Sequence, residues 1–249
     1  MLAENIKKLE DFCERFDVQI DDMNIKGLYL KGKNIDDDGL KYLCENLEFK
    51  DLDLSENDIS DIKPLEKAKF EKLENISLSS NKISDINILE NTNFKELKLL
   101  HLGGNNISDI KVLEKVNFRE LEILYLWGNN VSNNIDILEK VNFPKLRVLD
   151  LNENNISDIK VLEKVNFKNL EKLYLSSNYD LADINILENV NFNKLKVLDL
   201  SWNNISDIKV FEKIKFEELE LLDLFGNNID INNCEGIINN LKSILKLNF

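Results

Sequence analysis

An asparagine that returns every 24 or 25 residues constrains this chain more than any other feature of its sequence. The eight copies are Asn57, Asn81, Asn105, Asn129, Asn154, Asn178, Asn203 and Asn227. Each lies in the same template, L-x-x-L-x-L-x-x-N-x-I-S-D-I-x-x-L-E-x-x-x-F. A unit this short cannot bury its own apolar side, so such units stack and share one continuous core. The sequence therefore predicts an elongated solenoid.

The first half of the template predicts a short strand in every repeat. Leucines such as Leu100 and Leu102 alternate with polar or aromatic residues, and side chains two positions apart share one face of a strand. The asparagine that follows can bond to turn backbone, where each buried unpaired group would cost roughly 1 to 3 kcal/mol. Each repeat is thus expected to add one parallel strand and one member of an asparagine ladder.

The second half of the template predicts short helices on the outer face. A Ser-Asp pair such as Ser108-Asp109 is typical of helix capping, and apolar residues then follow at a spacing of three. A phenylalanine returns in register at the bend back to the next strand, where stacked rings would bury a large apolar area. We interpret these rings as structural; they are Phe70, Phe94, Phe118, Phe143, Phe167, Phe192 and Phe216.

The ends of a solenoid need atypical units that cover the last apolar surfaces. Residues 1–24 are predicted to form an N-terminal helical cap, whose apolar residues are Ile6, Leu9, Phe12, Cys13 and Phe16. Residues 25–227 hold about nine repeats, the first of them degenerate. Residues 228–249 are predicted to form a C-terminal capping repeat with a last helix, containing Ile237, Ile238 and Leu241, and a final strand around Leu245 and Leu247.

The motif L-x-L-x-x-N-x-I-S-D-I-x-x-L, over about residues 25–247, resembles leucine-rich repeats of the internalin and protein-phosphatase-one-regulator type. This resemblance implies an α/β solenoid, a leucine-rich-repeat horseshoe with a parallel concave β-sheet and short helices on the convex side. It also implies recognition of a protein through the concave sheet. The repeats of this chain differ from that type in being about two residues longer and in their phenylalanine at the bend.

The charge of the chain bears on the kind of partner. A formal net charge of -14 disfavours nucleic acid, because phosphate-binding proteins need clustered Lys and Arg. Residues 1–24 carry too many charges for a signal-peptide core, and no apolar run approaches about 18 residues. We expect a cytoplasmic protein with no membrane insertion; a surface or secreted location would follow if a leader had been removed.

Metal and cofactor sites are not predicted. The three cysteines, Cys13, Cys44 and Cys234, are far apart and show no C-x-x-C spacing, although Cys13 and Cys44 could meet near the N-terminal cap. Free thiols are the simpler interpretation. The pair Gly103-Gly104 lies between a strand and a turn, and does not open a long helix as nucleotide-binding motifs do.

Residues that flank the buried leucines of each strand should point to the open, concave face. Large aromatic side chains there are informative, because they are enriched among the residues that dominate binding energy. A central apolar patch with aspartates on its C-terminal side would suit a partner with an apolar anchor and a basic flank. The predicted partner-binding residues are Leu99, His101, Ile123, Tyr125, Trp127, Val148, Asp150, Tyr174, Asp199, Trp202, Asp223 and Phe225.

Two arrangements in these rows could suggest catalysis, and we predict neither. His101 should lie between Ser77 and Tyr125 of adjacent strands, but an open sheet offers neither an oxyanion hole nor exclusion of water. Asp199 and Asp223 should lie one strand apart, as glycosidase carboxylates can, but without a cleft. No catalytic residue is assigned, and the chain is predicted not to be an enzyme.

The sequence thus predicts a monomeric protein-protein interaction module that binds its partner on the concave sheet. A second interpretation is a scaffold segment of a larger multidomain protein, without a dedicated ligand. In that case the exposed aromatic side chains would only cover the sheet or pack on each other, and substitutions there would leave function unchanged.

Overall fold

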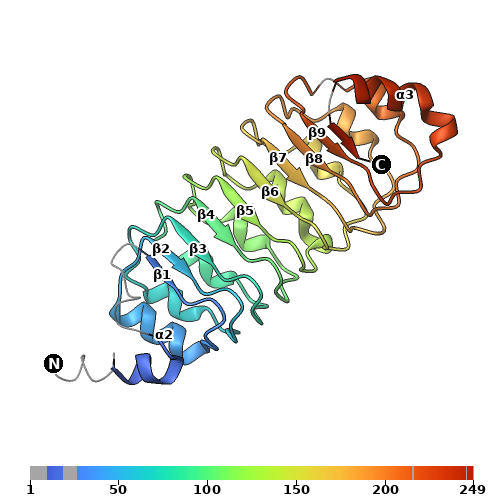
Figure 1. The fold of residues 1–249 in the computed structure, drawn as a ribbon. Coiled ribbons are helices and arrows are strands. Elements are labelled where there is room, and N and C mark those ends of the chain that lie inside the picture. Colours follow the sequence, from blue (N-terminus) through green and yellow to red (C-terminus); the bar gives the residue numbers. More distant parts are fainter. Residues whose placement is uncertain (1–9, 19–26, 215, 245, 249) are drawn as a thin grey trace.

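The computed structural model describes residues 10–18, 27–214, 216–244 and 246–248, and in it the repeats form one parallel sheet. Its ten strands follow each other in chain order along the molecule (Figure 1). The horseshoe predicted from the repeats is confirmed. The strands are β1 (Gly27–Tyr29), β2 (Asp51–Asp53), β3 (Asn75–Ser77), β4 (Leu99–His101), β5 (Ile123–Tyr125), β6 (Val148–Asp150), β7 (Lys172–Tyr174), β8 (Val197–Asp199), β9 (Leu221–Asp223) and β10 (Lys246–Asn248).

Short helices run along the other side of the solenoid, behind the sheet in Figure 1. In the described part of the chain seven are 3₁₀ helices: η2 (Lys63–Lys67), η3 (Asn87–Asn91), η4 (Lys111–Glu114), η5 (Ser132–Glu139), η6 (Lys160–Glu163), η7 (Asn185–Glu188) and η8 (Lys209–Glu212). The α-helices α2 (Asp37–Asn46) and α3 (Ile231–Ile244) lie near the two ends. A 3₁₀ helix repeats every three residues, which accounts for the apolar spacing of three in the sequence.

The strands bury one face only. In β5 the central Leu124 is fully buried, whereas Ile123 and Tyr125 are half-buried on the open face. Parallel pairing continues past the strand, since the Leu126 N–H donates to the Asp150 carbonyl at 2.9 Å. The residue after the second leucine is half-buried or exposed in some repeats, as at Trp127 and Phe225, and buried in others, as at Ser55 and Ser79.

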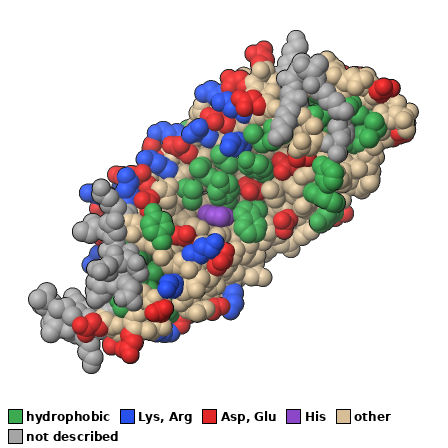
Figure 2. Space-filling view, viewed as in Figure 1, with side chains coloured by type: hydrophobic (Ala, Val, Ile, Leu, Met, Phe, Trp, Pro, Cys, Tyr) green, Lys and Arg blue, Asp and Glu red, His purple; other side chains and the backbone are tan. Residues whose placement is uncertain are grey.

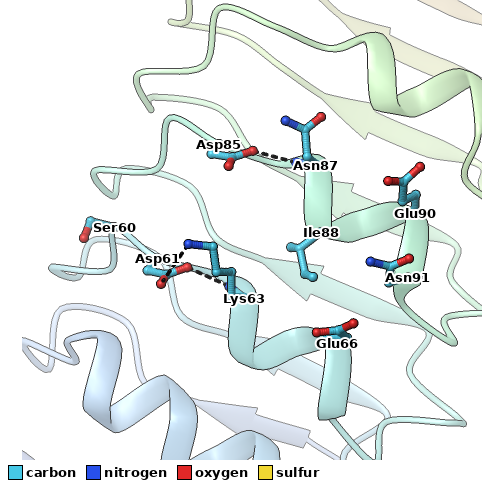
Figure 3. A pocket seen from close by; sticks show the side chains of 9 residues that line it. All are labelled: Ser60, Asp61, Lys63, Glu66, Asp85, Asn87, Ile88, Glu90 and Asn91. Atoms are coloured by element: carbon cyan, nitrogen blue, oxygen red, sulfur yellow. Dashed lines mark hydrogen bonds and ion pairs between the residues drawn. The ribbon is translucent and has the colours of Figure 1, made fainter.

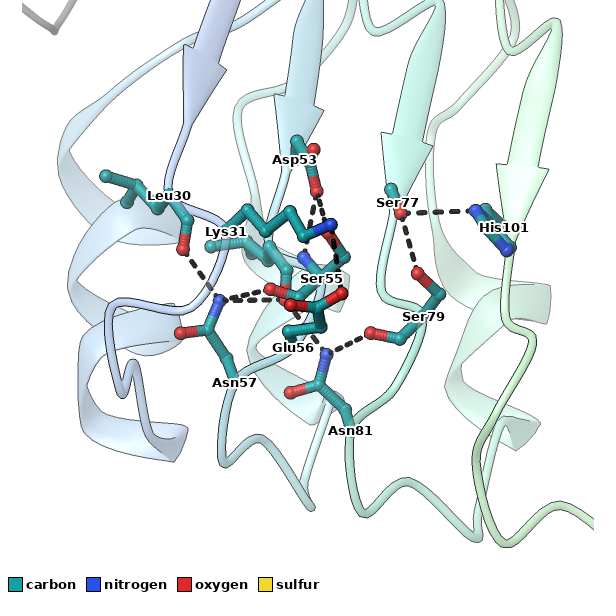
Figure 4. Close-up of polar contacts among 11 residues, drawn as sticks. Leu30, Lys31, Asp53, Ser55, Glu56, Asn57, Ser77, Ser79, Asn81 and His101 are labelled. Carbon is teal, nitrogen blue, oxygen red and sulfur yellow. Dashed lines mark hydrogen bonds and ion pairs between the residues drawn. The ribbon is translucent and has the colours of Figure 1, made fainter.

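The asparagines form the predicted ladder, and Figure 4 shows two of its members, Asn57 and Asn81. The Asn81 amide donates to the carbonyls of Leu54 at 2.9 Å and Leu78 at 3.1 Å, and its oxygen accepts from the Ile59 N–H at 2.9 Å. One side chain thus joins two repeats through buried backbone groups. Since these groups have no water to bond to, the ladder fixes the register of the stack.

Capping of the short helices differs in detail from the prediction. The N-cap residue of η4 is Ile110, whose side chain makes no cap bond; the Asp109 carboxylate of the predicted pair lies just before it and accepts from the Lys111 N–H at 2.9 Å. The phenylalanine column is buried from Phe70 to Phe192. It begins one repeat earlier than predicted, because Phe49 is also buried, with its ring centroid 5.7 Å from that of Phe70.

Different elements cover the two ends. Residues 10–16 are helical, and the buried Phe12 stacks on Tyr42 of α2 with ring centroids 4.9 Å apart. Two predicted members of that cap helix, Ile6 and Leu9, lie outside the described residues. At the other end α3 buries its predicted apolar residues, and β10 joins the sheet beside β9. All three cysteines are free thiols, and burial raises the pKa of Cys44 to about 12.

Candidate functional site

The register of the sheet places the predicted partner-binding residues in adjoining rows. His101, Tyr125, Asp150, Tyr174, Asp199 and Asp223 are direct neighbours across β4 to β9, each paired with the next. Leu99, Ile123 and Val148 pair in the same way in the row that precedes them. Figure 2 shows hydrophobic side chains gathered beside the single histidine, over the middle of the sheet. The predicted central patch is therefore contiguous.

His101 is the centre of a polar and aromatic cluster. The indole N–H of Trp127 donates to His101 Nε2 at 2.9 Å, and Ser77 Oγ lies 3.4 Å from Nδ1 (Figure 4 shows the serine contact). Nε2 accepts only when it carries no proton, so the ring is neutral and its Nδ1–H faces Ser77. Burial lowers the pKa of His101, against an opposing effect of Asp53. The histidine therefore holds Trp127 in place as a neutral acceptor.

Two glycines make room for Trp127. A Cβ added to Gly103 would overlap the indole, and one added to Gly104 would lie 3.1 Å from its far edge. The indole thus lies against the backbone of the preceding repeat and is half-buried on the open face. Tyr125 stands beside it, with its ring centroid 4.9 Å from that of His101. We call His101, Tyr125 and Trp127 the central aromatic cluster.

A second aromatic cluster lies near the C-terminal end of the sheet. Trp202 and Phe225 are 51% and 47% exposed, and their rings meet edge to face with centroids 5.3 Å apart. Trp202 has a φ of 54°, in the position where other repeats carry Gly104, Gly128 or Gly226. A bulky side chain is strained there, at a cost of roughly 1 kcal/mol or more. We call Trp202 and Phe225 the C-terminal aromatic cluster.

Carboxylates separate the two clusters. Asp150 lies between Tyr125 and Tyr174, and its Oδ1 accepts from the Asn152 N–H at 3.0 Å. Asp199 is held in the same way by the Ser201 N–H at 2.9 Å. Burial, with the nearby charge of Asp199, raises the pKa of Asp150 to about 6. Both carboxylates are thus held on the open face by backbone N–H groups, and that of Asp150 is partly desolvated.

Tyr29 also projects from the open face, with 66% of its surface exposed, and was not among the predicted partner-binding residues. It lies on β1, four strands from Tyr125, so it is not part of either aromatic cluster. The signal for its exposure was present in the sequence, because Tyr29 occupies the same template position as Tyr125 and Tyr174.

The convex side offers a different surface. A hollow of about 450 Å³ between η2 and η3 is lined mostly by acidic and amide side chains, together with Ser60, Lys63 and Ile88 (Figure 3). Asp61 and Asp85 use their carboxylates to accept from the N–H groups of Lys63 and Asn87 at 2.9 Å. Their role is to start the 3₁₀ helices. Within the described residues no group of three or more His, Cys, Asp or Glu side chains could hold a metal ion, and no helix is long and apolar enough to cross a bilayer.

Comparisons with known proteins agree with this architecture. Leucine-rich-repeat models match residues 144–189 and 193–208. No curated protein matches the sequence closely enough to count as a relative.

Solved structures share the fold at low sequence identity. An internalin C2 of Listeria monocytogenes is 22% identical with a TM-score of 0.62, over 88% of this chain and 90% of that one. A leucine-rich-repeat protein of Leptospira interrogans is 22% identical with a TM-score of 0.56, over 85% of this chain and 62% of that one. The plant peptide hormone receptor RGFR1, in complex with RGF2, is 19% identical with a TM-score of 0.53, over 82% of this chain and 36% of that one. The chain is thus a leucine-rich-repeat solenoid, and its solved structural neighbours include an internalin.

Proposed function

We propose that this chain is a protein-binding module and that its concave sheet is the contact surface. Leucine-rich-repeat proteins and receptor ectodomains of this fold generally bind partner proteins. The fold alone assigns no partner and no face, so the proposal rests on the open sheet of this chain.

The observation that carries the proposal is the replacement of small or polar residues by large aromatic ones at equivalent positions. Tyr125 and Trp127 stand where an earlier repeat has Ser77 and Ser79. The same strands form with either set, so the fold does not need aromatic side chains there. Half-exposed aromatic residues in a contiguous apolar patch are typical of surfaces that bind protein.

The scaffold interpretation has one observation in its favour. Trp127 packs on Gly103 and bonds to His101, and Trp202 packs on Gly226, so both indoles find contacts within the chain. Such contacts could mean that the rings only cover the sheet. They also restrict the rotamers of the rings before binding, which reduces the entropy cost of association.

An affinity capture from the source cell lysate separates the two interpretations. The parent is compared with Tyr125→Ala/Trp127→Ala, and with Tyr179→Ala as an aromatic control, since Tyr179 is 66% exposed outside the concave rows. Each truncated binding residue is expected to cost about 2 kcal/mol or more in affinity. A protein retained by the parent and the control but lost by the double variant supports the proposal. Equal capture by all three would favour the scaffold.

A further inference from the structure

From the central aromatic cluster towards the C-terminal one, the open sheet alternates aromatic and acidic side chains. Its central row reads Tyr125, Asp150, Tyr174 and Asp199 on β5 to β8, so aromatic rings and carboxylates alternate from strand to strand. Both tyrosines have a raised pKa, mainly because they are partly buried and in part because of Asp150. The phenol and carboxyl groups are therefore close enough to interact electrostatically.

Among the described residues, the carboxylates of this row have no cationic partner. Oδ1 of Asp150 accepts from backbone, and across the described residues no ion pair joins Asp150 or Asp199 to a lysine or arginine. The edge of the solenoid shows the contrast, since Arg147 pairs with Glu171 at 2.9 Å and with Glu122 at 3.3 Å. Some carboxylates at the edge are thus neutralised by a neighbouring cation, whereas Asp150 and Asp199 have no such neighbour among the described residues.

The spacing of the strands suits one cationic side chain. Neighbouring strands lie about 5 Å apart, so a cation over Asp150 would lie one strand spacing from Tyr125 and from Tyr174. Aromatic rings attract a cation within about 6 Å. A carboxylate floor flanked by two aromatic rings can therefore bind the charge of a lysine or arginine and pack against its apolar stem.

We propose that the partner inserts a lysine or arginine side chain between Tyr125 and Tyr174 to pair with Asp150, while an apolar side chain beside it lies on the central aromatic cluster. This assignment rests on the proposed function of the concave sheet and names the chemistry of the partner. The partner is a protein segment with a basic residue next to an apolar one.

Charge complementarity selects this occupant over others. A second copy of this chain would bring another formal charge of -14, and nucleic acid would bring phosphates, so both would meet the carboxylates with like charge. A basic protein segment would instead be attracted by the negative charge of these carboxylates. It also gives Asp150 a counter-charge, which no lysine or arginine in the described part of the chain provides.

The test uses a phage-displayed library of random dodecapeptides, selected on the folded parent chain. The selected peptides are then measured by fluorescence anisotropy on Asp150→Asn and on Glu163→Gln. Asparagine keeps the oxygen that accepts from Asn152, so the first variant removes charge without removing this turn bond. Glu163 is exposed on η6, and its variant changes the net charge by the same amount on the convex side.

The proposal predicts that selected peptides share a Lys or Arg next to an apolar residue. Asp150→Asn lowers the affinity for these peptides by about tenfold or more, as expected for a charge-assisted contact, and Glu163→Gln lowers it by less than about twofold. Replacement of the shared arginine by citrulline, its neutral analogue, causes a matching loss. Peptides that need Tyr125 and Trp127 but contain no basic residue, or that bind Asp150→Asn equally well, overturn this inference and leave the proposed function standing. Peptides indifferent to every concave substitution, or a selection that enriches none, count against both.

Discussion

Truncation of one ladder asparagine, Asn129→Ala, should destabilise the whole solenoid although it removes few atoms. The Asn129 amide donates to the carbonyls of Leu102 and Leu126, both at 3.0 Å, and its oxygen accepts from the Ile107 N–H at 2.9 Å. The two carbonyls keep a second donor each, from the ladder asparagines of adjacent repeats. The Ile107 N–H keeps none, because its only bond in the structure is to Asn129.

The stability loss of Asn129→Ala follows from which backbone groups keep a hydrogen-bond partner and which do not. A buried N–H left without a partner costs about 1 to 3 kcal/mol, and each lost donation to a carbonyl that keeps a partner costs about 0.5 to 1 kcal/mol. Together they predict a loss of about 2 to 5 kcal/mol in the free energy of unfolding. Asn130→Ala is the matched control, since Asn130 is exposed and its side chain makes one long contact, at 3.4 Å, with Asn155. Its cost should stay below about 0.5 kcal/mol.

Urea unfolding followed by circular dichroism and by tryptophan fluorescence measures both variants. The two signals must coincide and the denaturant slope must match the parent, because repeat proteins can unfold in parts. A loss below about 1 kcal/mol for Asn129→Ala, or an equal loss for both variants, would refute the ladder as a main source of stability.

Three further predictions concern the open face. NMR of His101, the only histidine, should give a pKa below 6.5. Trp127→Phe should raise this pKa, since the variant loses the indole N–H that bonds to the neutral ring, and an unchanged pKa would contradict the assigned bond. The stability that depends on the neutral ring is lost as the pH falls below 6.5. The pKa of Asp150, raised from 3.8 to about 6, means that ionisation of this carboxyl costs stability as pH rises through about 6. The full pKa shift would correspond to a cost of about 3 kcal/mol in folding free energy, of which screening at the open face leaves about 1 kcal/mol. Asp150→Asn should therefore stabilise the fold at pH 7 and not below pH 4; equal effects at both pH values would exclude ionisation of Asp150 as the cause. Gly103→Ala should displace the Trp127 indole and destabilise the chain, but much less in a Trp127→Ala background, as a double-mutant cycle would show; additive losses would mean that the indole does not lie on the glycine.

Most of the fold followed from the repeat. The period of Asn57 to Asn227 fixed the number of stacked units, and the leucine alternation identified the buried face of every strand. The prediction that open-face residues align in rows is confirmed by the strand register. The sequence pattern did not show which residue of the Ser-Asp pair bonds to the start of the helix. Asp and Ser can both accept from nearby N–H groups, and only backbone geometry selects one.

The candidate site was predictable as a list of positions, and less so as a set of contacts. Tyr125, Asp150 and Tyr174 were expected on one face, and they lie there side by side. The bond between Trp127 and His101 was not anticipated, since it depends on a side-chain rotamer and on the space above Gly103. The strained backbone of Trp202 has a signal in the sequence that was not used, because the same template position holds glycine in three other repeats, Gly104, Gly128 and Gly226.

By itself the sequence determined the solenoid, its parallel sheet, its asparagine ladder and the residues that reach the open face, since a fixed period and two-residue alternation admit one register. Only the tertiary structure decided what those residues do to each other. It laid Trp127 on the backbone of the preceding repeat, made His101 a neutral acceptor, and left Asp150 partly desolvated between two tyrosines. The physical reason is that hydrogen bonding, burial and pKa depend on atoms about 24 residues away in the chain, which become neighbours only when the repeats stack.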